Sequence, residues 1–189
     1  MEQYVEDKLF ENSDFTSLDL IDREFESCTF ENCNFSKNSL KRSRFSNCQF
    51  TDCNLSNTDI SKVSFQEVTF INCKLLGLHF DLCNPFGLEI QLTSCQADYC
   101  VFYQLDMRKS KFIDTRCSGT DFTEANLAGV DMINCDFREA IFDRTILKKA
   151  NLTDSYSYQI DPENNTLTGA AFSMPHVLNL LDKYTLKII

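Results

Sequence analysis

The feature that most constrains the fold is an apolar residue at every fifth position. From Val5 to Phe80, all sixteen residues at this spacing are Val, Ile, Leu or Phe, and a second frame, shifted by two, gives eleven apolar residues from Phe102 to Leu152. Because 43% of the chain is hydrophobic, a run of sixteen has a chance probability on the order of one in a million. A period of five matches neither the helix period of about 3.6 nor the strand period of two. Each five-residue unit must therefore turn the chain so that the same position faces inward again.

A small residue lies two positions before this apolar residue, which we call the centre of its unit. Cys83 and Cys95 keep that spacing near the change of frame, and Cys117 is itself a centre. Ser, Thr, Ala or Val often hold the small position elsewhere, and the other three positions are mostly polar. Each unit is therefore expected to direct one large and one small side chain inward. Seven of the ten cysteines precede a clear centre in this way, namely Cys28, Cys33, Cys48, Cys53, Cys73, Cys100 and Cys135.

This pattern resembles the pentapeptide-repeat family, whose motif is a small residue, Asp or Asn, a central Leu or Phe, and two mostly polar residues. The resemblance covers residues 5–154 and includes Cys33-Asn34-Phe35, Thr120-Asp121-Phe122, Ala125-Asn126-Leu127 and Cys135-Asp136-Phe137. It implies an all-β solenoid, a right-handed quadrilateral β-helix with four units in each coil. Residues 20 apart would then stack at the strand spacing of about 4.8 Å. The expected columns are Phe10, Phe30, Phe50 and Phe70, then Phe25, Phe45 and Phe65, then Phe102, Phe122 and Phe142, and Cys33, Cys53 and Cys73 as unpaired thiols.

The repeat region, residues 1–154, is interrupted at residues 81–92, where the frame slips by two. This segment contains Asn84-Pro85 and Gly87, which are turn signals. We expect a kink or a small loop with Phe86 exposed, the alternative being an insertion that packs flat on one side.

Residues 155–189 are expected to form a C-terminal cap and dimerisation tail. Ser173 is a plausible N-cap with Pro175 in the first turn of a short helix, and residues 184–189 are expected to form a final strand. Such an apolar helix either caps the last coil or joins the tail of a partner. The family resemblance favours a homodimer with a two-fold axis at this end. The dimerisation residues would be Val177, Leu178, Leu180, Leu181, Tyr184, Leu186 and Ile188.

Composition argues against several classes of protein. The net charge of −10 argues against binding nucleic acid through its phosphates, which requires clustered Lys and Arg. There is no run of 18 apolar residues to span a membrane and no secretory signal at the start. We therefore expect a cytoplasmic protein with reduced thiols. His79 and His176 are far apart in sequence, and no two cysteines are closer than five residues. We expect no enzyme activity, no metal and no cofactor.

The length, the break after residues 73–78 and the tail segments 158–161 and 171–175 resemble the albicidin-resistance and microcin-immunity pentapeptide proteins, and more distantly Qnr and MfpA. That resemblance implies a DNA-mimicking protein that binds DNA gyrase, and topoisomerase IV as a second target, and protects it from quinolone, albicidin or microcin-type inhibitors. A stiff acidic rod could enter a basic DNA channel. The partner-binding residues would be Asp106, Asp114, Asp121, Glu124, Asp131, Asp136, Pro85 and Phe86. The alternative is an interaction scaffold with no role at a topoisomerase.

Overall fold

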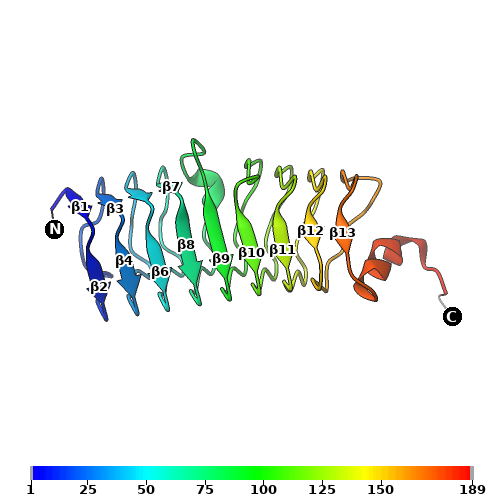
Figure 1. Ribbon diagram of the computed structural model, residues 1–189, viewed down its shortest axis with the longest axis horizontal. Coiled ribbons are helices and arrows are strands. Elements are labelled where there is room, and N and C mark those ends of the chain that lie inside the picture. Colours follow the sequence, from blue (N-terminus) through cyan, green and yellow to red (C-terminus); the bar gives the residue numbers. More distant parts are fainter. Residues whose placement is uncertain (1, 188–189) are drawn as a thin grey trace.

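The protein is a rod of stacked coils in which every strand pairing is parallel (Figure 1). The structure, a computed structural model, describes residues 2–187. Nine strands form one long sheet along the rod, and we number the coils 1–9 by them. In coil order they are β2 (Leu9–Glu11), β4 (Thr29–Glu31), β6 (Gln49–Thr51), β8 (Val68–Ile71), β9 (Ile90–Thr93), β10 (Lys111–Ile113), β11 (Asp131–Ile133), β12 (Asn151–Leu152) and β13 (Ala171–Phe172).

The rod has four sides, one for each five-residue unit of a coil. Side A begins with a four-stranded sheet of β1 (Tyr4–Glu6), β3 (Glu24–Glu26), β5 (Arg44–Ser46) and β7 (Ser64–Gln66). Side B is the nine-stranded sheet. Sides C and D are held by single parallel bridges, such as Asn34 with Asn54 on side C and Val101 with Asp121 on side D.

The register confirms the twenty-residue coil. Phe10 pairs with Phe30 and Phe30 with Phe50, whereas Val68 pairs with Ile90, an offset of 22 that absorbs the change of frame. Pairing continues past residue 154, because Asn151 pairs with Ala171. The expected boundary at residue 154 therefore lies inside the stacked region, which extends to Phe172.

Stacked phenylalanine rings fill the axis of the rod. Phe50 lies 4.6 Å from Phe30 and 5.0 Å from Phe70, centroid to centroid, and is fully buried. Rings of neighbouring columns meet edge to face, as Phe45 and Phe50 do at 5.5 Å. The predicted columns of Phe25, Phe45 and Phe65 and of Phe102, Phe122 and Phe142 are also stacked. Each buried ring contributes roughly 1.5–3 kcal/mol to stability.

The small inward residue has a polar role as well as a steric one. Its thiol or hydroxyl donates a hydrogen bond to the carbonyl oxygen of a centre in the preceding coil. Cys33 Sγ donates to Phe10 O at 3.4 Å, Thr58 Oγ1 to Phe35 O at 2.8 Å and Ser155 Oγ to Met132 O at 2.6 Å. All ten cysteines are buried and free. The predicted thiol column is confirmed, and the Cys33 backbone N–H donates to Cys53 Sγ at 3.4 Å.

Two further positions turn the chain at each corner. The Asp or Asn before many centres accepts a hydrogen bond from the backbone N–H two residues later, as Asp121 Oδ1 does from Thr123 at 2.8 Å. The second residue after the centre is commonly left-handed, with φ of +48° at Asn12 and +63° at Gly119. Asn, Asp and Gly tolerate this region best, which accounts for their frequency there.

The expected interruption is a small loop, and coil stacking continues across it (Figure 1). A single turn of 3₁₀ helix, η1 (Phe80–Leu82), leads into the loop. The Asn84 backbone N–H donates to Val63 O, which keeps the old register, and Ile90 begins the new one. The two extra residues therefore lie between Asn84 and Ile90.

The C-terminal tail differs from its predicted order, because the strand precedes the helix. β13 continues side B, and the 3₁₀ helix η2 (His176–Tyr184) follows it. Ser173 is not the N-cap: its hydroxyl accepts a hydrogen bond from the Asp154 N–H at 3.0 Å, which helps to attach the last coil. The final strand predicted from Tyr184 is wrong for residues 184–187, where the helix ends and Thr185 is left-handed. Ile188 lies outside the described residues.

Candidate interaction surfaces

The loop at coil 5 is the first candidate surface. Phe86 at its tip is 80% exposed. Asn84 orders the loop from both ends of its amide: Nδ2 donates to Ser64 Oγ at 3.0 Å, and Oδ1 accepts from the Phe86 N–H at 3.1 Å. Gly87 lies against Gln66, whose Nε2 would be 3.1 Å from a Cβ at that position. The loop therefore leans over coil 4 and presents an aromatic side chain to solvent.

A groove of about 390 Å³ lies beside this loop on the coil 6 side. Two ion pairs border it, Arg108 Nη2 to Asp106 Oδ2 at 2.6 Å and Lys109 Nζ to Glu89 Oε2 at 3.6 Å. The hydrogen bonds from Arg108 lower the pKa of Asp106. The structure thus brings together two of the predicted residues, Pro85 and Asp106, at this groove, and Phe86 follows Pro85 in the exposed loop. The groove is lined by Pro85, Gly87, Leu88, Asp106, Arg108 and Lys109.

The other predicted carboxylates do not form one patch. Asp131 is on side B, Asp136 on side C and Asp121 on side D, while Asp114 and Glu124 follow centres on sides B and D. Asp114 and Asp154 do share a column: Asn134 between them donates from Nδ2 to Asp114 Oδ1 at 2.7 Å and from its backbone N–H to Thr153 O.

Several of these carboxylates already have partners, which sequence reasoning missed. Asp136 lies 3.7 Å from Arg138, and Glu124 lies 2.7 Å from Arg144. Hydrogen bonds from Gln104 and Arg144 lower the pKa of Glu124. The spacing Asp-x-Arg at residues 106–108 and 136–138, and the twenty-residue offset from Glu124 to Arg144, were the available signals.

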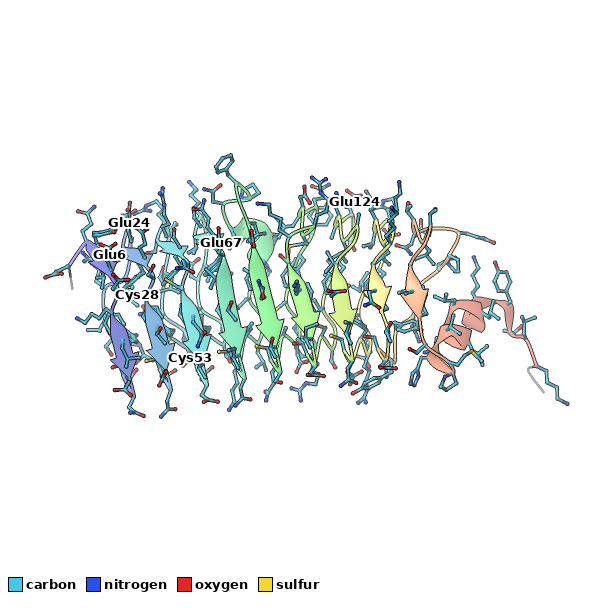
Figure 2. The ribbon with its side chains drawn as sticks, in the orientation of Figure 1. Glu6, Glu24, Cys28, Cys53, Glu67 and Glu124 are labelled. Atoms are coloured by element: carbon cyan, nitrogen blue, oxygen red, sulfur yellow. The ribbon has the colours of Figure 1, made fainter. Side chains whose placement is uncertain are left out.

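Negative charge is concentrated at the N-terminal end instead. The first 36 residues hold ten acidic and two basic residues. Glu6 and Glu26 are in register on adjacent strands, and so are Glu11 and Glu31. Figure 2 shows Glu6 and Glu24 together at this end, with Glu67 nearer the loop. Stacked like charges repel each other, so this end has a net negative potential, although Asp19 pairs with Arg23 and Asp22 with Arg42.

The C-terminal end is capped by η2. Leu180 packs with Leu167 and Phe172 against the core. Lys183 Nζ clamps the helix to the preceding segment through Asp161 at 2.6 Å and Glu163 at 2.8 Å, and hydrogen bonds from Lys183 lower the pKa of both carboxyls. Of the two alternatives for this helix, capping is therefore observed. The remaining predicted dimerisation residues stay partly accessible, since Val177, Leu178 and Leu181 are half-buried and Tyr184 and Leu186 are exposed.

Ionisable groups elsewhere are arranged for structure. His79 Nδ1 lies 3.3 Å from Asp81 Oδ1, and His176 packs near the Tyr156 ring at 5.9 Å. Burial raises the pKa of Cys48, Cys100 and Cys135 to about 12, so these thiols are poor nucleophiles. Within residues 2–187, no group of three His, Cys, Asp or Glu side chains could hold a metal ion. In the same residues, no helix is long and apolar enough to cross a membrane.

Comparison with known proteins agrees with this geometry. One family model, described as a pentapeptide repeat region, matches residues 19–94, and another, described as pentapeptide repeats (8 copies), matches residues 115–154. The chain belongs to the pentapeptide-repeat family. No curated protein matches this pentapeptide-repeat protein significantly in sequence.

Solved structures of other pentapeptide-repeat proteins share the fold. A trypsin-treated form of QnrB1, described as a plasmid-mediated fluoroquinolone resistance protein, is 23% identical, with a TM-score of 0.69 over 98% of this chain and 90% of that one. A second such form is 19% identical, with a TM-score of 0.56 over 98% and 100% of the chains. HetL from the cyanobacterium Nostoc sp., described as involved in heterocyst differentiation regulation, is 17% identical, with a TM-score of 0.56 over 88% and 84%.

Proposed function

We propose that this pentapeptide-repeat protein is an interaction protein that binds a type II DNA topoisomerase, DNA gyrase or topoisomerase IV. In this proposal it protects the enzyme from inhibitors of the quinolone, albicidin or microcin type. The observation that carries the proposal is a continuous acidic rod that matches the QnrB1 fold over 98% of its length. QnrB1 is itself described as a fluoroquinolone resistance protein.

The proposed mechanism is mimicry of DNA. A rod with a net charge of −10 would approach a positively charged DNA channel by electrostatic steering. The potential is strongest over coils 1 and 2, where acidic side chains outnumber basic ones most. Association would therefore slow as salt is added, since screening acts on exposed charges.

The proposed contact surface includes the loop and three carboxylates. Pro85 and Phe86 would supply the apolar contact, because Phe86 is exposed. Asp114, Asp121 and Asp131 are in no ion pair within residues 2–187, so their charge is available to a basic partner. Asp106, Glu124 and Asp136 would contribute less, because an arginine already neutralises each of them.

We also propose that the protein acts in the cytoplasm as a homodimer joined at its C-terminal end. The half-buried side chains of Val177, Leu178 and Leu181 would be covered by the same surface of a second copy. Ten free thiols suit a reducing compartment.

A supercoiling assay tests the proposal. Purified gyrase with a fluoroquinolone should retain supercoiling activity when this protein is added at low micromolar concentration. Deleting Phe86 and Gly87, which leaves a coil of twenty residues, should abolish protection while circular dichroism shows an intact fold. Asp131→Asn should weaken protection, whereas Asp106→Asn, which removes a neutralised charge, should weaken it less.

Equal inhibition with and without the protein, over a wide concentration range and with topoisomerase IV as well, would rule the proposal out. The alternative would then stand, namely a scaffold without a topoisomerase partner. The ion-paired state of Asp106, Glu124 and Asp136 is the observation that favours this alternative.

A further inference from the structure

Charge changes sign along side A of the rod. Exposed carboxylates of Glu6, Glu24 and Glu26 lie in coils 1 and 2. At the other end of the same side, Lys148 and Lys149 follow the centre Leu147 in coil 8 and are exposed. Neither lysine is in an ion pair within residues 2–187. The loop at coil 5 lies midway between the acidic and the basic ends (Figures 1 and 2).

The loop and its groove are asymmetric about this midpoint. Hydrogen bonds and packing attach the loop to coil 4, through Asn84 to Ser64 and through Gly87 to Gln66. The groove lies on the opposite, coil 6 side, beside Arg108 and Lys109. Side A therefore carries an exposed aromatic knob displaced toward coil 4 and a hollow displaced toward coil 6.

We infer that side A binds side A of a second copy of this chain in an antiparallel arrangement, with the two-fold axis at coil 5. In an antiparallel pair, coil 8 lies opposite coil 2 and coil 6 lies opposite coil 4. Lys148 and Lys149 then face Glu24 and Glu26, and they do so twice, once on each side of the axis. Each Phe86, displaced toward its own coil 4, faces the groove at coil 6 of the partner.

The remaining charges of side A contribute less to this arrangement. Glu67 in coil 4 faces coil 6, where Arg108 and Lys109 are already paired with Asp106 and Glu89. Arg44 in coil 3 faces coil 7, where Asn126 precedes the centre Leu127 and Ala128 and Gly129 follow it, so Arg44 faces no cation there. A parallel pair would instead place like charges opposite each other, which costs free energy. Electrostatics therefore selects the antiparallel pair, and screening by salt should weaken it.

This contact is separate from the proposed C-terminal dimer and does not depend on the proposed function. It uses side A, whereas the C-terminal contact uses the end of the rod. A topoisomerase that also bound the loop would compete with the second copy for Phe86. The purified protein alone is therefore sufficient to detect this contact.

Charge reversal tests the pairing by sedimentation velocity at low ionic strength. The wild-type protein should show an association that disappears at high salt. Two double variants should each lose this association, because each carries one sign of charge at both ends of side A. One combines Glu24→Lys with Glu26→Lys, and the other combines Lys148→Glu with Lys149→Glu. Mixing the two variants should restore it, since every contact then joins opposite charges. A control matched to the first variant, Glu11→Lys with Glu31→Lys on side B, makes the same change in net charge as Glu24→Lys with Glu26→Lys and should still associate.

Cross-linking tests the orientation. All ten native cysteines are buried, so engineered surface thiols react selectively. Glu24→Cys mixed with Lys148→Cys should form a mixed disulfide dimer, and neither variant alone should form one efficiently. Phe86→Ser should weaken association by roughly 10- to 100-fold, the loss expected for an unburied aromatic ring. Failure of the mixture to associate or to cross-link, or self-cross-linking of Lys148→Cys alone, would overturn the antiparallel pair.

Discussion

The stacked core makes a quantitative prediction about two phenylalanines of one column. Phe50 is fully buried and contacts four rings, Phe30 and Phe70 by stacking and Phe35 and Phe45 edge to face. Phe10, in coil 1, is 8% exposed and contacts three rings, only one of them stacked. Truncating a buried Phe to Ala costs about 3–5 kcal/mol, and an aromatic pair contributes about 0.5–1.5 kcal/mol beyond area burial.

Phe50→Ala should therefore lower the free energy of unfolding by about 4–5 kcal/mol, and Phe10→Ala by at least about 1 kcal/mol less. Urea denaturation followed by far-UV circular dichroism, under reducing conditions, measures both values. Because a solenoid is stabilised by nearest-neighbour coils, Phe10→Ala should also lower the urea dependence of unfolding by releasing coil 1 alone. Equal costs for the two variants, or a larger cost for Phe10→Ala, would refute the reasoning that stacking neighbours set the stability of each coil.

Three further predictions concern the thiols, the corners and the cap. Burial raises the pKa of Cys48, Cys100 and Cys135 to about 12 from an ordinary value near 9, so the unfolded chain loses these protons first. The free energy of unfolding should then fall as pH rises from 9 towards 12, and replacing the three thiols by Ala should flatten that fall in denaturation curves measured across this range. Gly129→Ala should lower the free energy of unfolding by about 1 kcal/mol, because the Ala must be left-handed. Gly119→Ala should lower it further, because the added Cβ would lie 2.7 Å from the Tyr99 ring. A double-mutant cycle with Tyr99→Ala should remove this difference, and a difference that stays unchanged would contradict the steric explanation. Asp161 and Glu163 have lowered pKa values, so their clamp on Lys183 should be present at neutral pH and lost as pH falls below about 4. Protection of residues 176–184 from hydrogen exchange, relative to the intrinsic exchange rate at each pH, should fall in that range, and Lys183→Ala should lower this protection at neutral pH.

Much of the fold could be predicted because one inward position repeats at fixed spacing. The columns through Phe30, Phe50 and Phe122 follow from counting alone, once five residues are understood to turn the chain. The spacing did not predict that Cys33 and Thr58 both donate a hydrogen bond to a backbone carbonyl, because that carbonyl belongs to the preceding coil.

The candidate site was less predictable, because an acidic residue in this repeat has several uses. Asp121 orders a turn, and Asp106 and Asp136 bind arginines, so composition could not identify which carboxylates are available to a partner. The tail strand was misplaced because periodicity fades there. Ala171 and Phe172 continue the twenty-residue register, whereas the apolar residues among 184–189 favour a strand by composition alone.

Distances between spin labels in solution test most directly the claim that residues 20 apart stack. Leu9, Lys111 and Ala171 occupy equivalent positions on side B in coils 1, 6 and 9, and all are exposed. Labels attached to Cys at positions 9 and 111, and at 9 and 171, should be about 24 Å and about 38 Å apart along the rod, at about 4.8 Å for each coil. Narrow distributions that differ by about 14 Å would agree with the stacked rod, whereas similar distances for the two pairs would contradict it.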